Sequence, residues 1–257
     1  SSSAASDVYK RQIITGAARG IGLATANIFL QQNYKVVIVD RDRNEVNKLK
    51  LKNDKLLKYI CDISDPKKNK SMIEDIYKWG KRIDILVNNA GVADFGKIET
   101  VKFKNWRKIM DTNLDGTFLT TQNVIKYLKK TKGNIINIAS ISGLRASTLR
   151  IAYGTSKAAI IQLTQQQAIE LGEFGIRVNC VSPGPVKTKL AQAVHTPDIV
   201  KAYHDSIPLN RYGMEKEIAE AIFFWSSEKA SYITGQNLSV DGGFEASGVG
   251  LISLRES

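Results

Sequence analysis

The sequence predicts an α/β protein with a doubly wound parallel sheet, in which helices cover both faces of the strands. Short runs of Ile, Val and Leu alternate along the chain with longer helical segments. The apolar runs are continuous and do not alternate with polar residues, which is typical of parallel strands buried on both faces. Repeated strand–helix–strand order favours a single three-layer domain.

The expected strands are the short runs that are richest in Ile, Val and Leu. In chain order they are Ile13–Thr15, Lys35–Asp40, Leu56–Ile60, Ile83–Asn88, Asn134–Ser140, Arg177–Ser182 and Asn237–Val240. The expected helices are the longer segments between these runs. They are Gly20–Asn33, Arg43–Lys52, Lys67–Gly80, Phe103–Lys132, Ala152–Phe174 and Glu215–Ser226.

No linker, composition shift or internal repeat divides the 257 residues. A chain of this length can bury roughly three-quarters of its unfolded surface in one core. The stretch Val186–Gly213, before the last expected helix, is predicted to be irregular. Because long excursions in compact domains are often lids or binding loops, we expect a substrate loop at about residues 186–213.

The first twelve residues, SSSAASDVYKRQ, are expected to be foreign to the domain, which then covers residues 13–257. Residues 2–12 are what a common transposase sequencing adapter encodes in one reading frame, so they are expected not to belong to the native protein. The apolar run at Ile13 should extend backwards along the chain. Arg11 and Gln12 would therefore place polar side chains where a buried strand favours apolar ones.

Charge and composition exclude several classes of protein. The net charge is +12, from 37 basic and 25 acidic residues. Because the lysines are spread along the chain, we expect a solvated basic surface and no nucleic-acid partner. No run of 18 apolar residues predicts a membrane span. Two cysteines, Cys61 and Cys180, are too few for a disulfide scaffold, so we expect a reduced, cytoplasmic setting.

Glycines follow the first expected strand, directly before a helix. The segment reads TGAARGIG and contains Gly16, Gly20 and Gly22. Glycines let the backbone turn tightly and approach a pyrophosphate, while the helix N-terminus offers free N–H groups and the positive end of a dipole. The spacing differs from the usual G-x-G-x-x-G pattern, so an ordinary tight turn is the alternative interpretation.

An acidic residue, Asp40, ends the second expected strand. At this position a carboxylate is placed to bind the ribose hydroxyls of an adenosine and to repel a 2′-phosphate, which favours NAD. Arg19 and Arg41 argue the other way, because a guanidinium can hold a phosphate. NAD is therefore the expected cofactor, and NADP stays open.

A tyrosine and a lysine, Tyr153 and Lys157, lie four residues apart near the start of a long expected helix. This spacing puts both side chains on one face. A phenol with a pKa of about 10 is a poor base at neutral pH, and a nearby ammonium lowers that pKa. The pair predicts a general acid/base, although the same spacing is common on ordinary helices.

Further motifs lie at the ends of the other expected strands: NNAG ends the fourth, a serine ends the fifth and PGPVKT follows the sixth. Together with TGxxxGIG, an asparagine in the long helix, and YxxxK, they occur in the order found in the short-chain dehydrogenase/reductase family. The chain resembles this family from Ile13 to about Phe244. The resemblance implies a single Rossmann-like domain, usually assembled as a homotetramer, and hydride transfer between a nicotinamide and a carbonyl or alcohol.

The resemblance also assigns roles to side chains. It implies that Tyr153 is the general acid/base, that Lys157 lowers its pKa and holds the nicotinamide ribose, and that Ser140 orients the substrate oxygen. Asn113 would hold a water in a proton relay from Lys157. Beyond Tyr153 and Lys157, the implied cofactor contacts are Gly16, Arg19, Gly20, Ile21, Gly22, Asp40, Arg41, Asp62, Asn89, Gly91, Val186 and Thr188.

We therefore expect an NAD(P)-dependent oxidoreductase acting on a small secondary alcohol or ketone, with a sugar or polyol dehydrogenase favoured. A 3-oxoacyl thioester reductase of the same family is the alternative. A dinucleotide-sensing protein without turnover is the alternative from another class, because a fold does not fix a function. His195 and His204 are nine residues apart, which matches no familiar metal-ligand spacing, so no metal site is expected.

Overall fold

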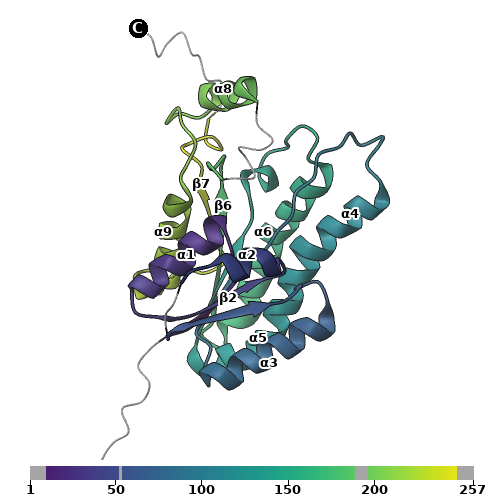
Figure 1. The fold of residues 1–257 in the computed structure, drawn as a ribbon. Helices are drawn as coiled ribbons and strands as arrows, with labels where there is room; N and C mark the ends of the chain where they lie inside the picture. The colour runs from purple at the N-terminus through teal and green to yellow at the C-terminus, as the bar shows by residue number, and fades with distance from the viewer. Residues whose placement is uncertain (1–9, 52–53, 189–195, 248–257) are drawn as a thin grey trace, which may run out of the picture.

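The computed structural model describes residues 10–51, 54–188 and 196–247, and the predicted α/β fold is confirmed within them. A seven-stranded parallel sheet has the order β3-β2-β1-β4-β5-β6-β7, and helices cover both of its faces (Figure 1). The strands are β1 (Arg11–Thr15), β2 (Lys35–Asp40), β3 (Leu56–Ile60), β4 (Ile85–Asn88), β5 (Asn134–Ile138), β6 (Arg177–Pro183) and β7 (Asn237–Val240).

The helices fill the connections between consecutive strands. They are α1 (Gly20–Gln31), α2 (Arg43–Lys48), α3 (Pro66–Gly80), α4 (Phe103–Met110), α5 (Gly116–Thr131), α6 (Ile151–Gly172), α8 (Pro197–Ser206) and α9 (Glu215–Ser226). A π-helical turn, η1 (Asp111–Asp115), joins α4 to α5, and short 3₁₀ turns occur at η2 (Ile141–Gly143) and η3 (Glu228–Ala230).

The strand order reverses at the centre of the sheet, between β1 and β4. The chain first adds β2 and β3 on one side of β1, and then crosses back to place β4 on the other side. In open α/β sheets, ligands bind beyond the carboxyl ends of the strands at such a reversal. The turn after β1 and the turn after β4 therefore lie side by side where a ligand is expected.

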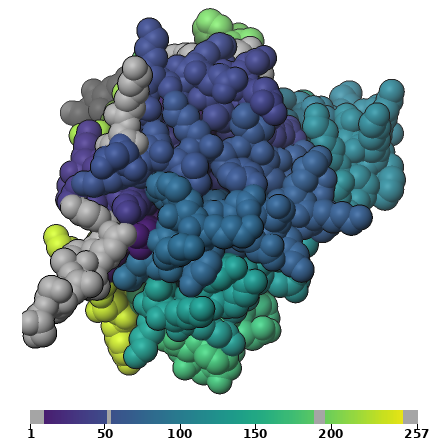
Figure 2. Space-filling view, turned by 60° about the horizontal axis from the view of Figure 1, so that its bottom comes forward, coloured from purple at the N-terminus to yellow at the C-terminus, as the bar shows by residue number. Residues whose placement is uncertain are grey.

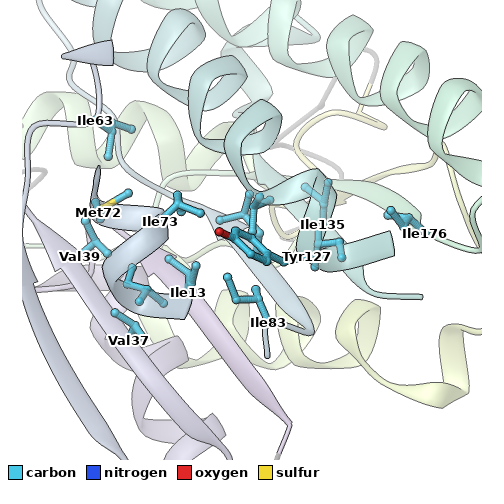
Figure 3. Close-up of a cluster of buried hydrophobic side chains, with 14 of the residues drawn as sticks. Ile13, Val37, Val39, Ile63, Met72, Ile73, Ile83, Tyr127, Ile135 and Ile176 are labelled. Atoms are coloured by element: carbon cyan, nitrogen blue, oxygen red, sulfur yellow. The ribbon is translucent and has the colours of Figure 1, made fainter. Parts of the chain in front are cut away.

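Two apolar cores form because neighbouring residues of a strand point to opposite faces of the sheet. On one face, Ile13 and Val37 pack against Met72 and Ile76 of α3 and against Leu128 of α5 (Figure 3). The other face carries the adjacent strand residues, which pack against α1 and α9. This second core includes Ile14, Val36, Phe29, Ile218 and Ile222. Burial on both faces explains why the strand sequences are continuously apolar.

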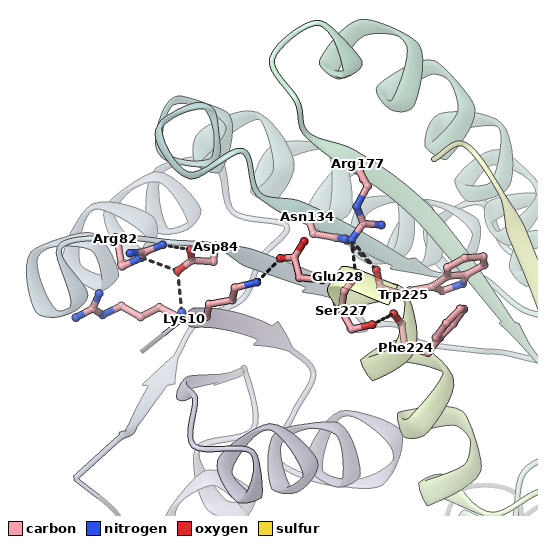
Figure 4. Close-up of polar contacts among 10 residues, drawn as sticks. Lys10, Arg82, Asp84, Asn134, Arg177, Phe224, Trp225, Ser227 and Glu228 are labelled. Carbon is pink, nitrogen blue, oxygen red and sulfur yellow. Dashed lines mark hydrogen bonds and ion pairs between the residues drawn. The ribbon is translucent and has the colours of Figure 1, made fainter. Parts of the chain in front are cut away.

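Polar contacts hold the amino ends of the strands, opposite the expected site (Figure 4). The carboxylate of Asp84 pairs with Arg82 and accepts a 2.9 Å hydrogen bond from the backbone N–H of Arg11. Arg177 Nη2 and Asn134 Nδ2 both donate to the carbonyl of Trp225, at 3.0 and 2.9 Å. These bonds satisfy buried backbone groups that would otherwise destabilise the fold.

The first strand begins earlier than Ile13, as its apolar run suggested. Arg11 and Gln12 are both buried within β1, and Gln12 pairs in register with Val36 and Ile85. Within the described residues, neither the Oε1 nor the Nε2 atom of Gln12 has a hydrogen-bond partner. The expectation of polar side chains at apolar positions is confirmed. Residues 1–9 lie outside the described part of the chain.

Two expectations about local structure were wrong. The segment Phe103–Lys132 is not one regular helix, because η1 interrupts it and shifts the register between α4 and α5. The stretch Val186–Gly213 is not irregular throughout, because it contains α8, which Thr196 caps by accepting a hydrogen bond from the backbone of Ile199. The ends of this stretch meet, since Val186 and Gly213 form a parallel bridge.

The segment that carries α4 protrudes from the body of the molecule in the space-filling view (Figure 2). In Figure 1 the same helix lies at the edge of the fold, at the carboxyl end of the sheet. Among the described helices, none is long and apolar enough to cross a membrane.

Candidate active site

The turn after β1 requires glycine at two positions for different reasons. Gly16 has a φ of +62°, and a Cβ there would lie 2.7 Å from the Cα atom of Ala90. A Cβ on Gly22 would lie 2.5 Å from the carbonyl oxygen of Gly16. The two glycines allow the turn to fold closely against both the start of α1 and the turn after β4.

Asn89 and Thr15 hold these two turns together. Asn89 Nδ2 donates to the carbonyl oxygens of Thr15 and Gly16, at 3.0 and 2.9 Å. The Thr15 hydroxyl in turn accepts from the backbone N–H groups of Asn89 and Ala90, at 3.1 and 3.0 Å. The expected position of Asn89 beside the ribose stays a prediction, and its amide fixes the glycine turn. Thr15 was not among the expected site residues, although it is the one hydroxyl within the first apolar run.

The N-terminus of α1 fits the pyrophosphate of a dinucleotide. Arg19, at the N-cap, makes no side-chain capping bond, and there is no acidic residue in the first turn formed by Gly20, Ile21 and Gly22. The nearest atom to a Cβ built on Gly20 is Glu215 Oε1, at 3.8 Å, so the backbone is open at this point. Uncapped N–H groups and the helix dipole favour an anion here.

Three acidic residues surround the position expected for the adenosine. Asp40 accepts hydrogen bonds from the backbone N–H groups of Ala18 at 3.1 Å and Asp42 at 3.0 Å, which fixes its carboxylate beside the glycine turn. Arg19 lies 3.4 Å from Asp42, and Arg41 lies 3.9 Å from Asp62. Each arginine that was expected to favour a 2′-phosphate thus lies against a carboxylate.

Tyr153 and Ser140 come together from different elements. Ser140 follows β5 in an extended conformation, and Tyr153 lies in the first turn of α6. Burial raises the pKa of the Tyr153 hydroxyl, while a hydrogen bond with Ser140 and the positive charge of Arg150 lower it. Lys157 was expected to be the cation that lowers this pKa, and that role stays a prediction. Its Nζ atom lies 5.8 Å from the centre of the Tyr153 ring, and Arg150 is a second cation beside the same ring.

The ammonium of Lys157 is buried beneath the site. Only 4% of the residue is exposed, and Nζ donates a 2.7 Å hydrogen bond to the carbonyl of Ile138. Burial lowers the pKa of Lys157 to about 8. A Cβ on Gly91 would lie 3.5 Å from Lys157 Nζ and 3.4 Å from Asn113 Oδ1. Gly91 therefore leaves room where the lysine and the asparagine approach each other.

Asn113 lies in the π-helical turn η1, which directs its side chain inwards. Its Oδ1 atom accepts from the N–H of Val92 at 2.8 Å, and its Nδ2 atom donates to the carbonyl of Val92 and to Ser156 Oγ, both at 3.0 Å. Asn113 was expected to hold a water, and that role stays a prediction. Its amide ties the turn after β4 to α6, and its contacts with Val92 and Ser156 were not anticipated from the sequence.

Val186 and Thr188 start the excursion that follows β6. Val186 is buried and forms the bridge with Gly213, and the Thr188 N–H donates to the Val186 carbonyl at 2.8 Å. His195 lies outside the described residues. Within the described part of the chain, no three His, Cys, Asp or Glu side chains gather as metal ligands.

Comparison with known proteins assigns the family. A family model described as enoyl-(acyl carrier protein) reductase, which belongs to the short-chain dehydrogenases/reductases, matches residues 16–245. This chain is a short-chain dehydrogenase/reductase. The match covers most of the sequence and both turns of the candidate site. As a short-chain dehydrogenase/reductase, the protein is an oxidoreductase that binds NAD(P).

Curated relatives of this short-chain dehydrogenase/reductase carry out different reactions. The 3-oxoacyl-(acyl-carrier-protein) reductase of Thermotoga maritima is 35% identical over 90% of this chain and 96% of its own length. The NAD-dependent glycerol dehydrogenase of Listeria innocua is also 35% identical, over 91% of this chain and 93% of its own length. Because the chain is equally identical to both enzymes, overall sequence identity does not indicate which substrate it uses.

Solved structures support the same family. The aldohexose dehydrogenase of Thermoplasma acidophilum superposes with a TM-score of 0.86 at 32% identity, over 93% of this chain and 95% of that chain. The structure named ElxO with NADP bound gives a TM-score of 0.87 at 31% identity, over 93% of this chain and all of that one. Short-chain dehydrogenases/reductases similar to this chain therefore include proteins named with either cofactor.

Proposed function

We propose that this chain is an NAD-linked dehydrogenase of a small secondary alcohol, with sugars or polyols as the favoured substrates. The observation that carries the proposal is the position of Asp40. Two backbone N–H groups hold its carboxylate beside the glycine turn, where a 2′-phosphate would meet a fixed negative charge. Arg19 and Arg41 lie against Asp42 and Asp62, which weakens their attraction for that phosphate.

The side chains at the carboxyl end of the sheet have different roles in the proposed reaction. Ser140 and Tyr153 bind the substrate hydroxyl, and Tyr153 in its deprotonated form accepts the hydroxyl proton. Lys157 lies next to Tyr153, and Asn113 holds the backbone turn that adjoins Lys157. A bound NAD would supply the hydride acceptor for the alcohol carbon. The hydroxyl loses one proton and the carbon loses one hydride, so the product is a ketone.

Reduction of a 3-oxoacyl thioester is the second candidate, favoured by the similarity to the Thermotoga maritima reductase. It uses the same groups in reverse, because Tyr153 then donates a proton to the carbonyl oxygen. NAD-linked enzymes more often serve oxidation, so the fixed carboxylate of Asp40 argues for the first candidate. A protein that senses dinucleotides without turnover has no need of the Ser140, Tyr153 and Lys157 set.

Absorbance at 340 nm tests these alternatives. The protein is offered NAD or NADP with polyols and sugars, and NADH or NADPH with an acetoacetyl thioester. We expect oxidation of a polyol or sugar with NAD, lost by at least about 100-fold in Tyr153→Phe. Fluorescence titration should show that this variant still binds NADH. Faster thioester reduction with NADPH contradicts the proposal, and dinucleotide binding without any turnover favours the sensor.

A further inference from the structure

Two loops meet beside Tyr153 and bring Arg150 to the candidate site. The N–H of Gly96, in the loop before α4, donates a 3.0 Å hydrogen bond to the carbonyl of Leu149, and Gly96 and Arg150 form a parallel bridge. Figure 1 shows both loops at the carboxyl end of the sheet. Leu149 has a φ of +63°, a left-handed conformation that is costly for a leucine. This turn places Arg150 at the N-terminus of α6, three residues before Tyr153.

The guanidinium of Arg150 lies against two aromatic rings. Its Cζ atom is 3.7 Å from the centre of the Phe95 ring and 5.3 Å from the centre of the Tyr153 ring. Stacking on aromatic faces holds a guanidinium in place and leaves its N–H donors available at the edge. Arg150 is therefore oriented by the fold and is close to the group that reacts with the substrate.

The charge of Arg150 has no acidic partner in residues 10–51, 54–188 and 196–247. The acid that precedes Phe95, Asp94, accepts hydrogen bonds from the Phe95 N–H and from Asn105 Nδ2. By contrast, the two arginines near the glycine turn, Arg19 and Arg41, each have a carboxylate within 4 Å. A partly buried, oriented cation without a counter-ion favours a ligand that brings one.

A cavity of about 710 Å³ adjoins this arginine. Lys97, Arg145 and Arg150 line it with one acid, Glu99, so its charged groups are predominantly positive. Ser140 and Tyr153 do not line this cavity, but Arg150 borders both the cavity and the Tyr153 ring. Arg150 thus lies between the candidate acid/base and a predominantly positive surface hollow.

We propose that the substrate is a hydroxy acid and that Arg150 is a specificity-determining residue that binds its carboxylate. The proposal rests on the dehydrogenase function above and names the substrate class for it. The alcohol group lies at Ser140 and Tyr153, where its carbon loses a hydride and its hydroxyl loses a proton as described, while the carboxylate stays unchanged against the guanidinium. The product is the corresponding keto acid.

Matched substrate pairs test this proposal. Aldonic acids and short-chain hydroxy acids are each compared with the uncharged polyol or alcohol of the same carbon number. We expect kcat/KM to be about 10- to 100-fold higher for the acid, which is the range of one charge-assisted pair of hydrogen bonds. In Arg150→Gln this ratio should collapse, mainly through a raised KM for the acid. Arg150→Lys should retain part of the preference, because it keeps the charge and loses the planar fork.

Lys104→Gln is the control, because it removes a positive charge from an exposed position of α4 that does not line the cavity. We expect it to change the acid-to-alcohol ratio by less than about threefold, as is typical of an exposed charge. Equal losses for acid and alcohol in Arg150→Gln would overturn the proposal, because they would mean that Arg150 acts on Tyr153 alone. A wild-type preference for the uncharged substrates would overturn it as well.

Binding measurements separate this proposal from the proposed function. Calorimetric titration of the protein–NADH complex with a keto acid requires no turnover. We expect binding to the wild type that weakens at least about tenfold in Arg150→Gln. If no alcohol is oxidised with either cofactor, the dehydrogenase proposal fails, and this titration still decides the role of Arg150. No difference between the two proteins in the titration overturns the carboxylate site.

Discussion

The side-chain amide of Asn113 pairs with the backbone of Val92 through two hydrogen bonds of 2.8 and 3.0 Å. The pairing joins the π-helical turn η1 to the turn after β4, and so sets the position of Gly91 above Lys157. Asn113 contributes to the site at least by holding its backbone, whether or not a water also binds there.

Asn113→Ala should therefore destabilise the fold. It leaves the N–H and the carbonyl of Val92 without their partner and removes one of the two hydrogen bonds of the Ser156 hydroxyl, at a cost of about 2 to 3 kcal/mol. For a domain of this size, the melting temperature should fall by roughly 4 to 10 °C. Asn105→Ala is the control, because the bond from Asn105 to Asp94 is exposed. Equal melting temperatures for the two variants would refute the positioning role.

Lys157→Met should show a pH-dependent effect on stability. Burial lowers the pKa of Lys157 from 10.5 to about 8. Below pH 8 the amine is protonated in both the folded and the unfolded state, so the folded state carries the full cost of the buried charge. Between about pH 8 and 10.5 the folded state loses its proton first, and the wild type gains stability relative to the variant.

The measurement is the difference in melting temperature between Lys157→Met and the wild type from pH 7 to 10. We expect the variant's advantage to be largest at pH 7 and to decrease steadily above pH 8. The lost hydrogen bond to Ile138 shifts the whole curve without changing this trend. Lys108→Met, at an exposed position, should give a constant difference. A constant difference for Lys157→Met as well would contradict the assigned cost of burial.

Asp40→Asn should weaken the preference for NAD. The change removes the negative charge with little change of shape, so the ratio of kcat/KM for NADP to that for NAD should rise at least about tenfold. Asp40 accepts hydrogen bonds from two backbone N–H groups, one on each carboxylate oxygen. In Asp40→Asn, one of these N–H groups will face the amide nitrogen, so a modest loss of stability is expected. Glu45→Gln removes an equal charge on α2, where Glu45 pairs with Lys48. An equal rise in this control would mean that total charge, and not Asp40, selects the cofactor.

Gln12→Met should stabilise the protein. Gln12 is fully buried, and in the described structure its amide atoms have no hydrogen-bond partner. Methionine keeps the length of the side chain and removes the buried polar group, which should gain about 1 to 3 kcal/mol. Chemical denaturation measures the change, with the exposed Gln162→Met expected within about 0.5 kcal/mol of the wild type. A loss of stability in Gln12→Met would show that the glutamine is compatible with its site.

The strand positions and the turns that bear glycine could be predicted from sequence, because apolar runs and glycines depend on local chemistry. The structure of α8 was missed, although Thr196 and Pro197 are residues that commonly begin a helix. The roles of Thr15 and Val92 could not be predicted. Each depends on a partner that is distant in sequence, Asn89 or Asn113, and no periodic pattern encodes such a pair.

The bridge between Val186 and Gly213 has a consequence for how this fold can diversify. Because the excursion leaves and rejoins the body at adjacent points, its length and sequence can change without moving a strand. Doubling such a segment costs only about 0.6 kcal/mol in closure entropy. Residues 187–212 can therefore differ between enzymes that keep the same proton-transfer groups. The same segment can be replaced as a unit in protein engineering.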